Sequence, residues 1–172
     1  MIAIENARLL KELQARTDDL QESLEYQTAT SDVLKVISGS SFDIQSVFDT
    51  ITATAARLCG SDSAAITMRE GEVYRYVSLY VGARTRADDE YWASLRQRTI
   101  VPGRQSVAGR VALEGRVVQV ADVAADPDYV QPETVAAGHR TVLGVPLLRE
   151  GVVLGTISIS RKRVEPFTER QR

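Results

Sequence analysis

Apolar and polar positions in the first 37 residues repeat with the spacing of a helix. The segment contains no Pro or Gly and is rich in Leu, Glu, Gln, Ala and Lys, which favour helix. The residues of two neighbouring seams recur every seven positions, which is typical of a coiled coil. One seam holds Leu10, Thr17, Leu24 and Ser31, and the other holds Asn6, Leu13, Leu20, Gln27 and Leu34. We predict a long helix that pairs in parallel with a second copy, through Leu10, Leu13, Leu20, Leu24 and Leu34. The alternative is an amphipathic helix lying on its own domain.

A second helical pattern follows a break at residues 38–43, where Gly39 interrupts the first. Asp43 is suited to cap the start of the new helix, and Gly60 is suited to a left-handed position after its end. Its apolar stripe consists of Ile44, Val47, Phe48, Ile51, Ala55 and Leu58. Cys59 lies at the end of this helix without a neighbouring histidine or basic cluster. We expect a buried, unreactive thiol there.

Alternating patterns then predict strands. Residues 64–69 and 73–81 form a hairpin around Gly71. Strict alternation in the second strand would place Tyr74, Tyr76, Ser78 and Tyr80 on one face. Residues 88–98 predict a short helix that carries Tyr91, Trp92 and Leu95.

The second half of the chain predicts a helix, a strand, an irregular loop and a final hairpin. Ser106 can cap a helix that ends at Gly115, and residues 117–123 form a strand. Residues 140–162 form two strands joined at Glu150–Gly151. The first of them is apolar on both faces, so we expect it to be central and covered on both sides. Pro146 cannot donate to a ladder, which indicates a bulge at that position.

These elements predict an α+β domain, because consecutive hairpins build an antiparallel sheet, here of about five or six strands. Helices before and after the sheet would cover one face, and the inserts within residues 84–140 would cover the other. A chain of 172 residues suits one domain with an appendage. We divide it into a coiled-coil helix at residues 1–37 and a domain at residues 38–172.

Composition and charge limit the classes of partner and the cellular compartment that we expect for this chain. The formal net charge is −2 and no one-sided basic run occurs, which argues against nucleic acid as the main partner. The single cysteine excludes an internal disulfide and fits a cytoplasmic location. No apolar run reaches the roughly 18 residues of a membrane span, and no signal peptide is visible. A longer parent protein anchored elsewhere stays compatible with this segment.

No catalytic constellation is visible, and we predict that the chain is not an enzyme. It has one histidine, no Gly-rich phosphate loop and no spacing typical of metal ligands. The acidic run at residues 88–90 fits a solvated helix start better than an acid–base pair.

Four stretches of the chain resemble the GAF domain of bacterial signalling proteins. They are FDIQSVFDTITATAARLC (42–59), SVAGRVALEGRVVQVADV (106–123), DPDY (126–129), and RTVLGVPLLREGVVLGTISI (140–159) followed by EPFTERQ. The resemblance covers about residues 30–172. It implies dimerising helices on one face of the sheet, a small-molecule pocket on the other, and a position upstream of an output domain such as a histidine kinase or a nucleotide cyclase. AIENARLLKEL (3–13) resembles the last helix of a preceding GAF domain, so we expect this chain to be a piece of a longer two-component or related sensor that lacks most of its closing helix.

The resemblance places a ligand pocket under the two inserts. The residues that we expect to bind a ligand are Tyr76, Ser78, Trp92, Ser106, Val107, Asp122, Tyr129, His139 and Arg140. Backbone N–H groups at residues 106–108 would suit an anionic group, and Arg140 and Asp122 would supply charge-assisted hydrogen bonds. In the alternative, the aromatic side chains fill the space and the domain is a structural dimerisation spacer without a ligand.

We predict no cofactor, with one alternative. Some haem-binding GAF sensors take a histidine from the loop that His139 occupies here. Bilin attachment needs a cysteine near the pocket, and Cys59 lies on the wrong helix. The NKFDE signature of cyclic-nucleotide GAF domains is absent, and a methionine-sulfoxide reductase of GAF type needs more than one cysteine. The preferred function is therefore a sensory module that dimerises and relays a small-molecule or partner signal to an effector domain outside this chain.

Overall fold

A computed structural model of the chain describes residues 2–38, 43–82 and 85–171. The chain divides into two units, Met1–Phe42 and Asp43–Arg172. In the first unit, α1 (Ile2–Ser38) is one continuous helix. The side chains of Leu20 and Leu24 are 66% and 61% exposed in the single chain. The side chains of Leu10, Leu13 and Leu34 lie outside the described residues, as does part of the predicted helix break, at 39–42. Pairing of two such helices stays a prediction.

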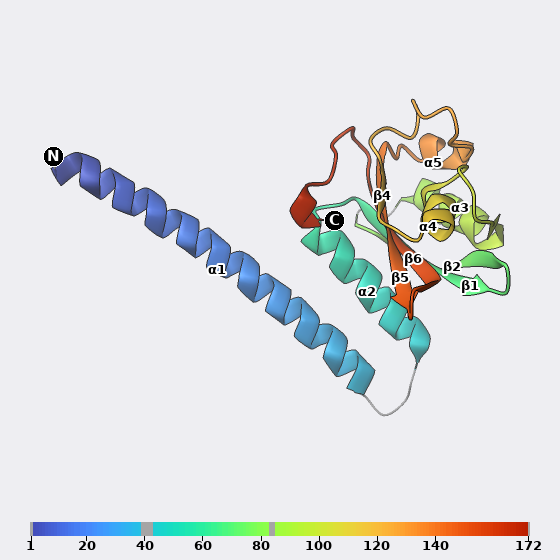
Figure 1. Cartoon of the computed structure of the whole chain (residues 1–172), viewed down its shortest axis with the longest axis horizontal. Coiled ribbons are helices and arrows are strands. Elements are labelled where there is room, and N and C mark those ends of the chain that lie inside the picture. The colour runs from blue at the N-terminus through green and yellow to red at the C-terminus, as the bar shows by residue number, and fades with distance from the viewer. Residues whose placement is uncertain (1, 39–42, 83–84, 172) are drawn as a thin grey trace. The chain divides into compact units, whose positions relative to one another are not determined.

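The second unit is built on a six-stranded antiparallel sheet with the order β3-β2-β1-β6-β5-β4. Its strands are β1 (Ser63–Glu70), β2 (Val73–Val81), β3 (Thr99–Ile100), β4 (Val118–Val120), β5 (Thr141–Arg149) and β6 (Val152–Arg161). Its helices are α2 (Ile44–Leu58), α3 (Arg86–Gln97), α4 (Val107–Glu114), α5 (Pro132–Ala136) and a 3-10 turn at Glu169–Gln171. Figure 1 shows α2 on one face of the sheet, with α3 and α4 on the other. The predicted α+β class and the antiparallel sheet are confirmed.

Local sequence signals explain where these elements begin and end. The Asp43 carboxylate accepts a hydrogen bond from the Gln45 N–H at 3.1 Å at the start of α2. The Ser106 hydroxyl accepts one from the Gly109 N–H at 3.0 Å at the start of α4. In the β5–β6 turn, Glu150 and Gly151 have φ angles of 53° and 80°, the left-handed pair that a tight two-residue hairpin requires. These predicted caps and this predicted turn are confirmed.

The prediction that β5 is central is wrong. The centre of the sheet is formed by β1 and β6, and β5 lies between β6 and the short edge strand β4. Both of its faces are nevertheless covered, because Leu143 packs with Phe167 and Val142 packs with Val107. Apolar residues on both faces of the strand indicate that both faces are buried. This pattern does not distinguish a central strand from the strand beside it. The register shift expected at Pro146 occurs one residue later, between Leu147 and Leu148.

Strict alternation along β2 is also wrong, because the strand contains a bulge. Ile66 pairs with Ser78 and Thr67 pairs with Tyr76, so Val77 is the extra residue. The Tyr76 ring therefore packs edge-on against Trp92 of α3, at 6.3 Å between ring centres. Ser78 turns to the opposite face and meets α2. The bulge thus divides the predicted row of tyrosines between the two faces of the sheet.

Candidate ligand-binding cavity

A cavity of about 40 Å³ lies between the sheet and the elements that cover its second face. Its floor consists of Ser63 and Ala65 of β1, Tyr76 and Leu79 of β2, Val142 of β5, and Ser158 and Ser160 of β6. Its cover consists of Tyr91, Leu95, Ser106, Val107, Ala108, Tyr129, Gln131 and Thr134. Gly144 permits this arrangement, because a Cβ there would lie only 2.8 Å from a methyl carbon of Val111. The α4 helix can therefore pack closely on β5 and form one wall.

Hydroxyl groups form a polar strip along the floor. Ser63 pairs with Ser160 across β1 and β6, and their hydroxyl oxygens lie 2.7 Å apart. The Ser160 oxygen also lies 2.9 Å from Nδ1 of His139. Ser158 stands two residues earlier on β6 and thus on the same face. Among the described residues, its hydroxyl has no hydrogen-bond partner, so it is available to a molecule in the cavity.

Phenol groups and an amide form the cover. The Tyr129 hydroxyl donates to the Gln131 side-chain oxygen at 3.1 Å. The Tyr91 and Thr134 hydroxyls lie 3.1 Å apart, and Thr134 donates to the same Gln131 oxygen at 3.3 Å. Burial raises the pKa of Tyr76, Tyr91 and Tyr129 above the ordinary phenol value. All three tyrosines are therefore neutral at physiological pH.

The charged side chains around the cavity are paired with one another. Arg110 is 7% exposed and binds Asp126 with two hydrogen bonds, of 2.7 and 2.9 Å. The other pairs are Arg140 with Asp122, Lys162 with Asp88, and Arg98 with Glu133. The hydrogen bonds from Arg110 and Arg140 lower the pKa of Asp126 and Asp122. None of the residues that line the cavity carries a charge at neutral pH.

His139 lies beside the cavity, where it contacts Ser160 of the floor and Tyr91 of the cover, and it is 1% exposed. Its ring lies against that of Tyr91, with 5.3 Å between the ring centres. Burial lowers its pKa to about 4, and the Lys162 charge contributes in the same direction. The loop that carries His139 therefore folds inward, and the imidazole is neutral at physiological pH.

These features do not fit haem. Pockets for ligands of that size have volumes of about 300–1,000 Å³, whereas this cavity has about 40 Å³. We derive no haem chemistry for this chain.

The structure brings some predicted site residues together and separates others. Tyr76, Ser106, Val107 and Tyr129 line the cavity, and His139 supports its floor. Four others lie elsewhere: Ser78, Trp92, Asp122 and Arg140.

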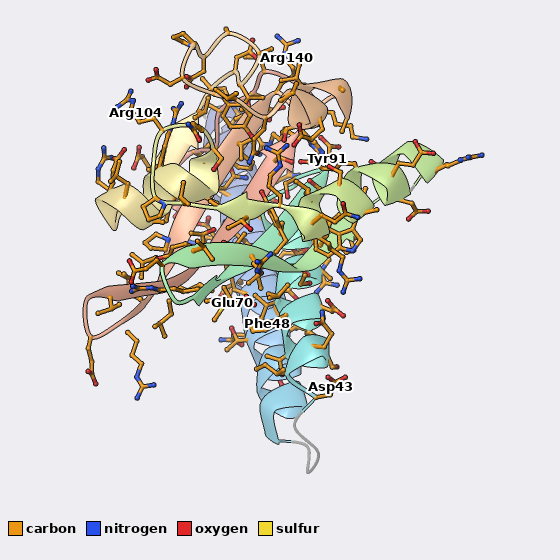
Figure 2. The ribbon with its side chains drawn as sticks, turned by 90° about the vertical axis from the view of Figure 1, so that its right-hand side faces the viewer. Asp43, Phe48, Glu70, Tyr91, Arg104 and Arg140 are labelled. Atoms are coloured by element: carbon orange, nitrogen blue, oxygen red, sulfur yellow. The ribbon has the colours of Figure 1, made fainter. Side chains whose placement is uncertain are left out.

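Each of these four has a physical reason for its position. Ser78 faces α2, where its hydroxyl donates to Asp49 at 2.6 Å and lies 3.0 Å from that of Thr52. Trp92 packs on the outer side of Tyr76, under the Arg96 guanidinium. Arg140 donates two hydrogen bonds to Asp122, of 2.8 and 2.6 Å, so the two charges satisfy each other. Figure 2 shows Arg140 among the loops and Tyr91 on α3.

Sequence reasoning missed the serines of the floor and the network of the cover. The sequence did contain a signal for the floor of the cavity. Polar residues recur at every second position of an otherwise apolar strand, at Thr156, Ser158 and Ser160. Such a period places all three side chains on one face. Tyr91, Gln131 and Thr134 carried no comparable local signal, because loop geometry alone brings them together.

Arg161 connects this face of β6 to the opposite one. It follows Ser160 and therefore points to the other side of the strand. The residue is 4% exposed, and its guanidinium donates to the Cys59 carbonyl at 3.0 Å and to the Glu165 carboxylate at 2.8 Å. It also lies 4.2 Å from the centre of the Phe167 ring. One side chain thus holds the end of α2 and the C-terminal segment 165–171 against the sheet.

The fold is an α+β domain with helices on both faces of an antiparallel sheet and a small cavity, lined by hydroxyl and apolar groups, on one of these faces. The family model of the GAF domain matches residues 43–172, and the chain belongs to this family. GAF domains are typically regulatory or sensory modules.

Solved structures give the same fold assignment. The GAF domain of a phosphoenolpyruvate-protein phosphotransferase from Coxiella burnetii is similar with a TM-score of 0.69 at 15% identity, over 88% of this chain and 84% of that chain. The A. aeolicus Nlh2 GAF domain, in an inactive state, has a TM-score of 0.63 at 16% identity, over 87% and 85%. A free methionine-R-sulfoxide reductase from Neisseria meningitidis, in complex with its substrate, has a TM-score of 0.63 at 16% identity, over 87% and 80%. No curated protein matches the chain.

Within residues 2–38, 43–82 and 85–171, no helix has both the length and the apolar composition that a membrane span requires.

Proposed function

We propose that this chain is a non-catalytic sensory or regulatory module of a bacterial multidomain signalling protein. It dimerises through α1 and relays a small-molecule or partner signal to an effector domain outside this chain, such as a histidine kinase or a nucleotide cyclase. The observation that carries this proposal is the position of β6. Ser158 and Ser160 line the cavity, and the next residue, Arg161, holds the C-terminal segment.

This arrangement supports signal relay because the cavity and the segment share one strand. Two further hydrogen bonds fix the segment to the sheet. The Glu165 N–H donates to the Thr141 hydroxyl at 2.9 Å, and the Phe167 N–H donates to the Gln119 side-chain oxygen at 2.8 Å. A molecule that moves β6 would alter the position of Arg161, and with it the contacts of residues 165–171. The chain would then have two arrangements whose populations a ligand can shift.

Amide hydrogen exchange tests this coupling without a known ligand. Ser158→Val adds volume to the cavity and removes a hydroxyl. We expect it to change the exchange rates of the Glu165 and Phe167 amides by about fivefold or more relative to the amides of β1. In an Arg161→Gln background the same change should have no effect on those two amides.

Ser94→Val provides the matched control, since Ser94 is exposed on α3. It should leave the Glu165 and Phe167 amides unchanged. If Ser158→Val acts equally with and without Arg161, the proposed relay through this side chain is wrong.

We propose a non-catalytic module because the Cys59 thiol is poorly suited to redox catalysis. One structural neighbour is a methionine-sulfoxide reductase, but Cys59 is the one cysteine of this chain. It lies at the end of α2 and does not line the cavity. Burial raises its pKa, which lowers the fraction of reactive thiolate. These features favour a binding module over a redox enzyme.

The proposed dimer predicts a strong effect of a charge in the helical seam. In a parallel pair, each Leu20 would bury its side chain, whereas it is exposed in the single chain. Leu20→Asp should weaken dimerisation by at least about 100-fold, since two buried leucines are lost per dimer at about 1.5–3 kcal/mol each. Light scattering across a dilution series measures the change. Ala15→Asp introduces the same charge outside both seams and should leave the dimer intact. An unchanged dimer in the Leu20 variant would remove the coiled-coil proposal.

A further inference from the structure

We infer that the cavity binds a small, uncharged molecule of about four non-hydrogen atoms that both donates and accepts hydrogen bonds, such as a simple amide. This inference rests on the proposed sensory function and specifies the chemistry of its signal. Three properties of the site support it: its size, its lack of charge and its hydrogen-bonding groups.

The size of the cavity sets an upper limit on the ligand. One water molecule needs about 10–15 Å³ of such space, and the cavity has about 40 Å³. It therefore holds about three waters, or a planar molecule of three or four non-hydrogen atoms if the cover relaxes slightly. Nucleotides, bilins and haem are excluded from the cavity as it stands.

The lining carries no charge to balance an ion. The three phenols are neutral because burial raises their pKa, and His139 is neutral because burial lowers its pKa. Arg98, Arg110 and Lys162 each already have a carboxylate partner. An anion or a cation in this space would lie buried without a counter-charge.

The start of α4 favours a carbonyl oxygen but does not offset a full charge. Residues 106–108 line the cavity, and the first N–H groups of a helix lack partners within it. A helix start strengthens the binding of an anion by at most about 30-fold, whereas burying an unpaired ion weakens binding by more than about 1,000-fold. The balance favours a neutral dipole whose oxygen faces α4.

The opposite side of the cavity offers complementary groups. The Ser158 hydroxyl has no hydrogen-bond partner within the described part of the chain, so it can accept a hydrogen bond from an N–H or O–H group and can also donate one. A molecule with an acceptor at one end and a donor at the other therefore satisfies both sides. An amide has this pattern, and so does urea.

Three probes of nearly equal shape separate charge from size. Acetamide, acetate and acetamidinium each have four non-hydrogen atoms and differ in charge. Each is titrated into the full chain at constant ionic strength, and amide chemical shifts of Ser158, Ser160 and Tyr129 are followed by NMR. We expect acetamide to bind saturably and at least tenfold more tightly than either ion. Ser158→Val should weaken acetamide binding at least tenfold, whereas Ser94→Val should not.

The possible results have distinct meanings. If acetate or acetamidinium binds as tightly as acetamide, the neutral ligand class is wrong while the cavity remains a binding site. If none of the three shifts these amides saturably, the small-ligand inference is overturned. If hydrogen exchange still shows the relay through Arg161 in that case, the chain remains a sensory module whose signal is a partner. If neither ligand binding nor the relay is seen, the domain is a structural spacer.

Discussion

Asp126→Asn is expected to lower the free energy of unfolding by about 3 kcal/mol, because it leaves a buried guanidinium without its counter-charge. Two terminal nitrogens of Arg110 donate to the two carboxylate oxygens of Asp126. An amide offers one neutral acceptor oxygen in their place, so one buried donor loses its partner. Urea unfolding at pH 7 measures the difference between the variant and the natural chain.

The neighbouring pair of Arg104 with Asp128 provides the matched control. Its nitrogen–oxygen distance is 2.6 Å, but its side chains are 67% and 45% exposed. Water screens such a pair, and Asp128→Asn should reduce stability by less than about 1 kcal/mol. A double variant, Arg110→Met with Asp126→Leu, should recover much of the loss, since it removes both charges together. Equal losses for the two asparagine variants would contradict the assigned role of the buried pair.

The same pair explains how the cover of the cavity is held. Arg110 belongs to α4, whereas Asp126 belongs to the loop that continues into Tyr129 and Gln131. Two further contacts fix this connection. Arg110 Nε donates to the Arg104 carbonyl at 2.6 Å, and the Val130 N–H donates to the Gln105 carbonyl at 2.9 Å. A loop without regular structure can therefore present two polar side chains to the cavity in fixed positions.

Much of the fold could be predicted because its signals are local. Asp43 and Ser106 cap their helices through their own side chains, and Glu150–Gly151 turns through its own backbone angles. Each depends on a few adjacent residues, and the sequence shows them directly. The order of strands in the sheet depends instead on which strands pair over long distances. The position of β5 beside an edge strand was accordingly missed.

The candidate site could be predicted only in part, because one extra residue in a strand changes the face of the sheet to which the following side chains point. The bulge at Val77 left no trace in the alternating sequence of β2, yet it moved Ser78 from the cavity to α2. Arg140 and Asp122 were expected to meet a ligand, but charged side chains of opposite sign stabilise each other when they can meet. Sequence indicates which groups are available and does not indicate which are already satisfied.

Lowering the pH is expected to destabilise the domain through His139 before most carboxylates titrate. Burial lowers the pKa of this imidazole to about 4, and Lys162 adds to the effect while Asp88 and Asp62 oppose it. In the unfolded chain the pKa is about 6.5. The unfolded state therefore binds the proton first, and the stability contributed by the neutral ring is complete above about pH 6.5. It is lost as the pH falls from about 6.5 to about 4, by about 3 kcal/mol in total.

Comparison with His139→Gln isolates this contribution. The free energy of unfolding is measured in urea at pH 7.5 and at pH 4 for both proteins. Carboxylates such as Asp126 lose stabilising pairs at low pH in both, so their effect cancels in the comparison. The natural chain should lose about 3 kcal/mol more than the variant over this interval. Equal losses would mean that the ring accepts its proton without disturbing Ser160 and Tyr91, and that the floor of the cavity is open enough to hydrate an ion. The inference of a neutral ligand requires a larger loss in the natural chain, because it depends on a buried charge on this side of the sheet being strongly destabilising.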